Sequence, residues 1–256
     1  MSESVIDDPW EGLKRFTAAR IALGRTGDSL PTAALLDFGV AHAAARDAVH
    51  RQLDEELLRG RLGALTTRTV AVGSAAPDRA TYLRRPDLGR RLSTESRTRL
   101  AELAPASPPD LVLVIADGLS ALAPERHAAP VLEAFLPLAG TLVVAPLVIA
   151  RMARVALGDE IGELWGARFV AMLIGERPGL SSPDSLGIYL TYQPRQGRSD
   201  AERNCISNIR PEGLSYASAA RKLHYLVQGA LRLKATGILL KDDSATDPVP
   251  VIELDP

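Results

Sequence analysis

The chain has 256 residues, 46% hydrophobic and 24% charged, so it is long enough to bury a sizeable core. Its formal net charge of -1 excludes the broad positive field of a nucleic-acid-binding protein. The single cysteine, Cys205, excludes an internal disulfide and a thiolate metal cluster made by this chain alone. No apolar run is long enough to span a membrane, and the acidic N-terminus has no signal-peptide pattern. We therefore expect a cytoplasmic protein that binds neither nucleic acid nor membrane.

Residues 1–105 are expected to form a helical N-terminal region. The spacing of the apolar residues predicts one helix over Trp10–Leu23. It predicts a second, Ala-rich helix that has Pro31 in its first turn and continues to about Leu58. Glycines and a proline interrupt the pattern between the two helices. A proline-rich segment at 105–109 then marks a boundary.

Beyond this boundary, residues 106–241 show buried strands that alternate with helices. The last predicted helix covers about Ser215 to Ala235. Such strands, buried on both faces, are typical of a mainly parallel sheet. We predict a doubly wound, Rossmann-like α/β domain, followed by a loose tail at residues 242–256. The predicted strands are Leu111–Ala116, Thr141–Ile149, Arg168–Ile174 and Gly187–Tyr192.

Three loops follow the predicted strands, and ligands bind beyond the carboxyl ends of strands in an open α/β sheet. They contain Asp117–Ser120, Gly175–Ser185 and Asn204–Asn208. In the second loop, Glu176 and Arg177 lie among glycine and proline, which permit close approach of a flat ligand. A turn with a local salt bridge is the alternative interpretation. No phosphate-binding glycine motif follows any strand, which counts against a dinucleotide or a nucleoside triphosphate.

The remaining candidates do not form a catalytic set. Ser120, with Asp117 and His127, suggests a hydrolase triad, but the sequence around Ser120 lacks the second glycine of a nucleophile elbow. A helix N-cap at Ser120 or Asp117 is the simpler interpretation. Cys205 is a packing residue, a ligand contact or a catalytic thiol, and the last of these needs a neighbour that lowers its pKa. The four histidines are far apart in sequence and indicate no metal site.

Several longer motifs occur in order between about residues 10 and 240. The most specific are Arg154-Val155 followed by Gly158–Glu163, then Gly175–Leu180, then Arg203–Asn208. Supporting motifs are Ala19–Gly27, Leu83–Leu92 and Ile115–Ser120. Taken together, they resemble the small (light) subunit family of ethanolamine ammonia-lyase.

The resemblance implies a carbon–nitrogen lyase that converts ethanolamine to acetaldehyde and ammonia by radical chemistry, with adenosylcobalamin as cofactor. In this family a large subunit binds ethanolamine, and the small subunit holds the corrin at the interface of the hetero-oligomer. The family's cobalamin contacts correspond here to Val155, Glu176 and Cys205, and the resemblance implies no catalytic or metal-ligating residue in this chain. The alternatives from other classes are a stand-alone cobalamin-binding module and a small hydrolase that uses Ser120.

Two further expectations accompany the resemblance. No histidine lies in an Asp-x-His-x-x-Gly motif, so we expect the cofactor's own base to remain on cobalt. Some family members carry a longer N-terminal extension that is tied to packaging in a bacterial microcompartment. This chain has only about nine residues before its first predicted helix, so we expect a free cytoplasmic enzyme rather than an encapsulated one.

Overall fold

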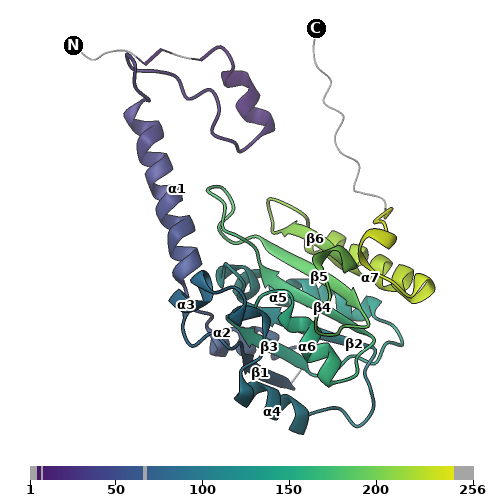
Figure 1. The fold of residues 1–256 in the computed structure, drawn as a ribbon. Coiled ribbons are helices and arrows are strands. Elements are labelled where there is room, and N and C mark those ends of the chain that lie inside the picture. Colours follow the sequence, from purple (N-terminus) through teal and green to yellow (C-terminus); the bar gives the residue numbers. More distant parts are fainter. Residues whose placement is uncertain (1–4, 7, 66–67, 245–256) are drawn as a thin grey trace.

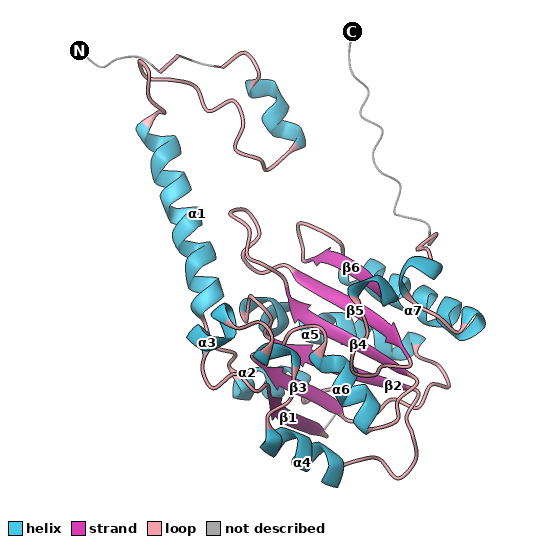
Figure 2. Cartoon of the chain, viewed as in Figure 1, coloured by secondary structure: helices cyan, strands magenta, loops and turns pink. Residues whose placement is uncertain are grey.

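The computed structural model describes residues 5–6, 8–65 and 68–244. It shows a mixed α/β body built on one six-stranded sheet, from which the long helix α1 projects (Figures 1 and 2). The strands are β1 (Thr69–Gly73), β2 (Leu111–Ala116), β3 (Leu147–Arg151), β4 (Phe169–Gly175), β5 (Leu186–Tyr192) and β6 (Arg203–Ile209). The helices are α1 (Thr32–His50), α2 (Glu55–Leu62), α3 (Arg79–Arg84), α4 (Thr94–Glu102), α5 (Leu122–Phe135), α6 (Leu157–Leu164) and α7 (Tyr216–Leu233). Short 3-10 helices are η1 (Glu11–Phe16), η2 (Leu88–Arg90), η3 (Leu136–Leu138), η4 (Asp200–Glu202) and η5 (Gly237–Leu239).

The strand order in the sheet is β1-β3-β2-β4-β5-β6. Strands β1 to β4 run parallel, whereas β5 pairs antiparallel with β4 and β6 pairs antiparallel with β5. The prediction of a mainly parallel sheet is thus confirmed for three of the four predicted strands, β2, β3 and β4. The fourth predicted strand, β5, is antiparallel, and the sheet gains a parallel strand, β1, and an antiparallel strand, β6, that were not predicted. The doubly wound, Rossmann-like description is not confirmed by this order.

The core lies on both faces of the sheet. Leu113 and Ile115 of β2 pack toward α2, α5 and α7, whereas Val112 and Val114 pack toward α4 and α6. All six side chains of β2 are fully buried. Burying one aliphatic side chain of this size contributes about 1.5–3 kcal/mol. The central strands therefore hold their carboxyl ends, and the loops that follow, on a rigid support.

The helix expected over Trp10–Leu23 is shorter than its apolar spacing suggests. Only Glu11–Phe16 is helical, as η1, and none of its side chains is buried. Ala22 and Gly24 have φ angles of 50° and 74°, which a right-handed helix does not contain. The apolar spacing alone does not produce a long helix here, because the segment has no surface to pack against.

The long helix expected from Pro31 to about Leu58 is divided into α1 and α2. The break lies at residues 51–54, where the chain contacts the buried carboxylate of Glu125. That carboxylate pairs with Arg51 at 2.8 Å and accepts the Asp54 amide hydrogen at 2.9 Å. The Asp54 side chain then caps α2 by accepting from the Leu57 amide. A tertiary contact thus ends α1.

Strand β1 lies within residues 1–105, where the sequence pattern indicated only helices. Its side chains alternate between half-buried and buried positions, as is typical of an edge strand. Val70 and Val72 face the side of the sheet that α4 and α6 cover. The helical description of this region is therefore wrong at β1, and the sheet includes residues from both sides of position 105.

The segment Asn204–Asn208, expected in a loop, forms most of β6. Its polar residues are half-buried or exposed, and Ile206 is the residue that points into the core. The predicted tail, 242–256, lies beyond the described residues after position 244. Within the described ranges, no helix combines the length and hydropathy needed to cross a bilayer.

A buried ion pair connects β6 to α6. Arg203 donates two hydrogen bonds to the carboxylate of Asp159, both at 2.6 Å, and both side chains are 1% exposed. Burial raises the pKa of Asp159, and the guanidinium of Arg203 opposes that rise. The pair holds the edge strand that carries Cys205, two residues farther along.

We expect Asp159→Asn to lower the free energy of unfolding by about 3 kcal/mol, because it removes the buried anion and leaves Arg203 only the exposed carboxylate of Asp200, at 3.4 Å. The matched control is Asp87→Asn, which breaks the exposed pair with Arg85. The control should cost less than about 1 kcal/mol. Urea denaturation measures both, and equal losses in the two variants would contradict the assigned role of the buried pair.

Candidate functional site

The loops after β2, β3 and β4 meet at the carboxyl edge of the sheet and enclose an open hollow of about 260 Å³. This is the edge at which open α/β sheets bind ligands. One wall comes from the loop after β2, one from the loop after β3 and one from the end of β4. The lining residues are Tyr82, Gly118, Leu119, Arg154, Val155, Ile174, Gly175, Glu176, Arg177 and Tyr189.

Two glycines allow the loops after β2 and β4 to cross. A Cβ on Gly118 would lie 2.2 Å from the Gly175 carbonyl oxygen, and a Cβ on Gly175 would lie 2.0 Å from the Ser120 carbonyl oxygen. Gly118 also has a φ of +53°, which glycine adopts without strain. The Leu119 amide donates to the Gly175 carbonyl at 3.0 Å. The backbone of the hollow is therefore close-packed.

Asp117 ties the loop after β2 to the loop after β3. Its carboxylate accepts from the amides of Met152 at 2.9 Å and Ala153 at 3.1 Å. It also accepts from the Arg79 guanidinium at 3.1 Å, and both side chains of this pair are almost fully buried. Burial raises the pKa of Asp117, and Arg79 and the two amides oppose that rise. This bonding fixes the position of Val155 relative to β2.

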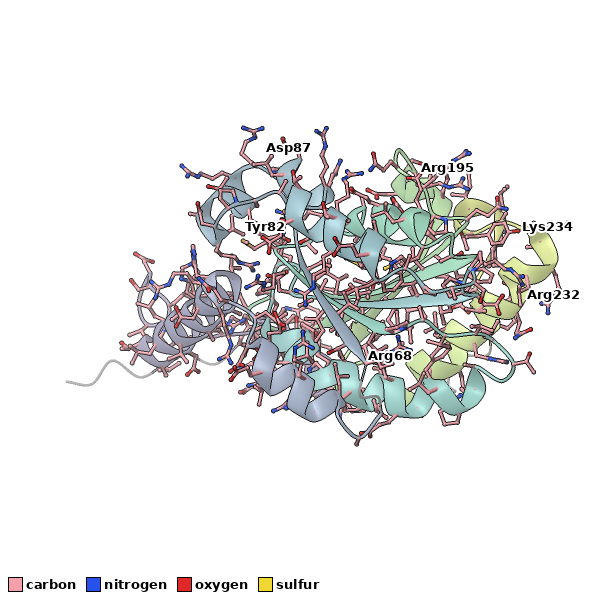
Figure 3. All side chains as sticks on the ribbon, turned by 90° about the horizontal axis from the view of Figure 1, so that it is seen from below. Arg68, Tyr82, Asp87, Arg195, Arg232 and Lys234 are labelled. Carbon is pink, nitrogen blue, oxygen red and sulfur yellow. The ribbon has the colours of Figure 1, made fainter. Side chains whose placement is uncertain are left out.

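Tyr82 lines the hollow, and its ring contacts two guanidinium groups. The charge centres of Arg79 and Arg154 are 4.9 Å and 4.5 Å from its ring centroid, distances typical of cation–π contacts. Its hydroxyl donates to the Ala153 carbonyl at 2.9 Å. Figure 3 shows Tyr82 within the body of the molecule and Asp87 at the outer surface. The packed ring holds Arg154 at the edge of the hollow.

Glu176 presents one carboxylate oxygen to the hollow. The other oxygen, Oε2, accepts from the Ser185 hydroxyl and from the Asn208 amide. A Cβ on Gly187 would lie 2.9 Å from Oε1, so the carboxylate rests against that glycine. Within the part of the chain that the structure describes, Oε1 has no hydrogen-bond donor. Glu176 is therefore an oriented acceptor with one free oxygen.

Cys205 is an exposed side chain on β6, directly opposite Tyr189 of β5. Its sulfur lies 3.1 Å from the Ser207 hydroxyl. Burial raises the pKa of Tyr189, and the neighbouring Cys205 thiol raises it further. Tyr189 lines the hollow, so Cys205 adjoins the hollow through that residue. Because the thiol is exposed, the interpretation of Cys205 as a packing residue is wrong.

The structure thus brings Val155 and Glu176 into one hollow and places Cys205 beside it. Sequence reasoning did not select Tyr82, Arg154 or Tyr189 as site residues. Of these three residues, only Arg154 lies in one of the most specific motifs, where it directly precedes Val155, so the sequence could have indicated it as a site residue. Tyr82 and Tyr189 reach the site through the packing of α3 and the pairing of β5.

The hydrolase triad does not form. The Ser120 side chain is fully buried, and its hydroxyl donates to the Pro183 carbonyl at 2.7 Å. His127 instead bonds to Tyr216 and Asp184. The expected cap is also wrong, because α5 begins after Ala121 without a side-chain cap. Ser120 and His127 hold the loop between β4 and β5.

No group of three His, Cys, Asp or Glu side chains is arranged to hold a metal ion anywhere in the described ranges. The site is therefore one of backbone, two arginines, a carboxylate and a thiol. Such a set can orient a large ligand through hydrogen bonds and apolar contact.

Comparison with known proteins identifies the family of the chain. The family model described as ethanolamine ammonia-lyase light chain matches residues 7–241. A Pseudomonas fluorescens protein named ethanolamine ammonia-lyase small subunit is 55% identical over 241 residues, which are 93% of this chain and 88% of that protein. A Ralstonia nicotianae protein of the same name is 53% identical over 254 residues, which are 98% of this chain and 93% of that protein.

Proposed function

Because the chain belongs to the ethanolamine ammonia-lyase light chain family, we propose that it is the small, cofactor-holding subunit of an adenosylcobalamin-dependent ethanolamine ammonia-lyase. The carbon–nitrogen lyase reaction converts ethanolamine to acetaldehyde and ammonia. The relatives' name, small subunit, supports a large-subunit partner. The observation that carries the proposal is that Val155, Glu176 and their neighbours form one open hollow at the ligand-binding edge of the sheet.

The residues of the hollow fit one part of a corrin. A corrin is a flat macrocycle with peripheral amides, which offer both hydrogen-bond donors and acceptors. The free Oε1 of Glu176 is an acceptor for such an amide, and the guanidinium of Arg154, a residue that lines the hollow, is a donor. Val155 supplies apolar contact between them.

The hollow is smaller than the ligand it would hold. About 260 Å³ lies just below the usual size of a pocket for a drug-sized molecule. The chain therefore covers only one part of the corrin, and the large subunit covers the rest. We propose that the corrin lies between the two subunits.

When bound, adenosylcobalamin supplies the radical chemistry through its cobalt–carbon bond, and the protein supplies binding and orientation. This chain's residues would hold the ring: Glu176 would accept an amide hydrogen and Arg154 would donate to an amide carbonyl, while the crossed glycines keep the two loops in close contact. The ethanolamine site belongs to the large subunit. We assign no catalytic side chain to this one.

The omission experiment tests the proposal directly. Co-purified with its large subunit and supplied with adenosylcobalamin and ethanolamine, the complex should produce acetaldehyde, and omission of this chain should abolish turnover. The visible spectrum of the cofactor should change only when both chains are present. Turnover by the large subunit alone, or no turnover by a folded complex, would refute the proposal.

We further propose that the cofactor keeps its own base on cobalt. In the described residues no histidine lines the hollow, and His127 is engaged by Tyr216 and Asp184. The EPR spectrum of the reduced cofactor in the complex should show nitrogen coupling from the cofactor's own base. In a second sample the protein is labelled with ¹⁵N histidine and the cofactor is left unlabelled. A hyperfine pattern that changes from ¹⁴N to ¹⁵N coupling in this sample would show a protein imidazole on cobalt and would contradict the proposal.

Glu176→Gln should raise the Kd for adenosylcobalamin by about tenfold, a loss of about 1.4 kcal/mol, because the charge-assisted bond becomes neutral. The matched control, Glu133→Gln, changes an exposed glutamate on α5 and should leave the Kd unchanged. Titration of the complex, followed by the cofactor's visible spectrum, measures both.

Cys205→Ala should have a smaller effect than Glu176→Gln in the same titration, because the exposed thiol loses little contact area. An unchanged Kd in Glu176→Gln, with an intact complex, would remove the site assignment. An unchanged Kd in Cys205→Ala would remove only the thiol from the site.

A further inference from the structure

Helix α1 is largely exposed, most of all in its first half. Of its 19 residues only Ala48 is buried, although the helix carries Leu35, Leu36, Phe38 and Val40. These four side chains are 57%, 63%, 43% and 72% exposed. A surface helix of a globular protein normally buries one apolar stripe, and a helix that is apolar all round is normally buried.

The segment before α1 shows the same property. We call residues 8–50 the arm. Among the described residues, eighteen large hydrophobic side chains are exposed, and eight of them lie in the arm. Trp10 of the arm is 66% exposed and Leu30 is 52% exposed. A hollow of about 500 Å³ separates the N-terminal loop from the start of α1, so the arm does not fold tightly onto itself.

The stability of α1 also indicates that the arm packs against a partner. An isolated helix of this length is marginal in water, and helices in proteins are stabilised mainly by packing of an apolar face. Between Thr32 and Ala45 the helix carries one charged side chain, Asp37. A surface of this kind suits an apolar protein partner rather than a polyanion.

The base of the arm and the cofactor hollow share one anchor, Arg79. Its Nε donates to the Val49 carbonyl at 2.8 Å, near the end of α1. Its Nη1 donates to Asp117 and to the Gly118 carbonyl, and Gly118 lines the hollow. The arm therefore starts at the carboxyl edge of the sheet. In Figure 1, α1 rises on the same side as the loop between β4 and β5.

We propose that the arm docks on the large subunit and continues the interface that encloses the cofactor; this inference rests on the proposed function above. The partner that covers the open hollow lies at the edge from which α1 projects, so it also meets the exposed side chains of α1. Leu36 and Val40, one turn apart on the same side of the helix, are the central contacts.

The test is the double variant Leu36→Glu/Val40→Lys in the co-expressed complex. Glu and Lys are good helix formers, the pair at i and i+4 supports the helix, and the net charge is unchanged. The matched control is Val143→Lys, which alters an exposed valine that precedes β3 at the opposite edge of the sheet. Sedimentation velocity over a dilution series measures the Kd between the subunits without cofactor.

We expect the double variant to raise this Kd at least tenfold with unchanged helix content by circular dichroism, and the control to match wild type. Wild-type affinity in the double variant would overturn the inference while leaving the proposed function intact. A double variant that only breaks self-association of this chain would overturn it too, in favour of a second copy as occupant. Failure of the wild-type subunits to associate would overturn both the inference and the proposed function.

Discussion

The candidate site depends on the buried carboxylate of Asp117. This side chain follows the central strand β2, accepts the amide hydrogens of Met152 and Ala153 after β3, and pairs with Arg79 at the start of α3. Loss of the carboxylate would leave two amides and a guanidinium buried with fewer partners, which is costly in a medium of low dielectric constant. Because Val155 lies two residues beyond Ala153, the apolar wall of the hollow is placed by the same carboxylate.

The carboxyl edge of the sheet leaves polar atoms without partners and apolar side chains without cover. The hollow is open, Oε1 of Glu176 and Nε of Arg154 lack partners within the described residues, and Cys205 is exposed beside it. The arm leaves the body at the same edge with its apolar side chains uncovered. Unpaired polar groups and exposed apolar helices are both unfavourable in a protein that works alone, and a partner subunit with a bound corrin would satisfy both.

How much of the fold the sequence predicts depends on where a strand lies in the sheet. Strands β2, β4 and β5 are predicted to within one residue at most ends, because continuous aliphatic runs mark strands buried on both faces. Strands β1 and β6 lie at the two edges of the sheet: β1 is only five residues long, and β6 has mostly polar residues between its buried positions, so neither shows a continuous aliphatic run. Likewise, the end of α1 at His50 depends on Glu125, which is distant in sequence and invisible to any local pattern.

By itself, the sequence determined the family and the alternation of strands and helices, and it singled out the loops after β2 and β4, where we propose that the ligand binds. It did so because long ordered motifs and buried aliphatic runs are local properties of the chain. Only the tertiary structure decided that Glu176 faces a hollow with Val155 and Arg154, that Cys205 adjoins it through Tyr189, and that the arm stays uncovered. These relations join residues that are far apart in the chain, and they arise from strand pairing and from buried charges that must find partners in space.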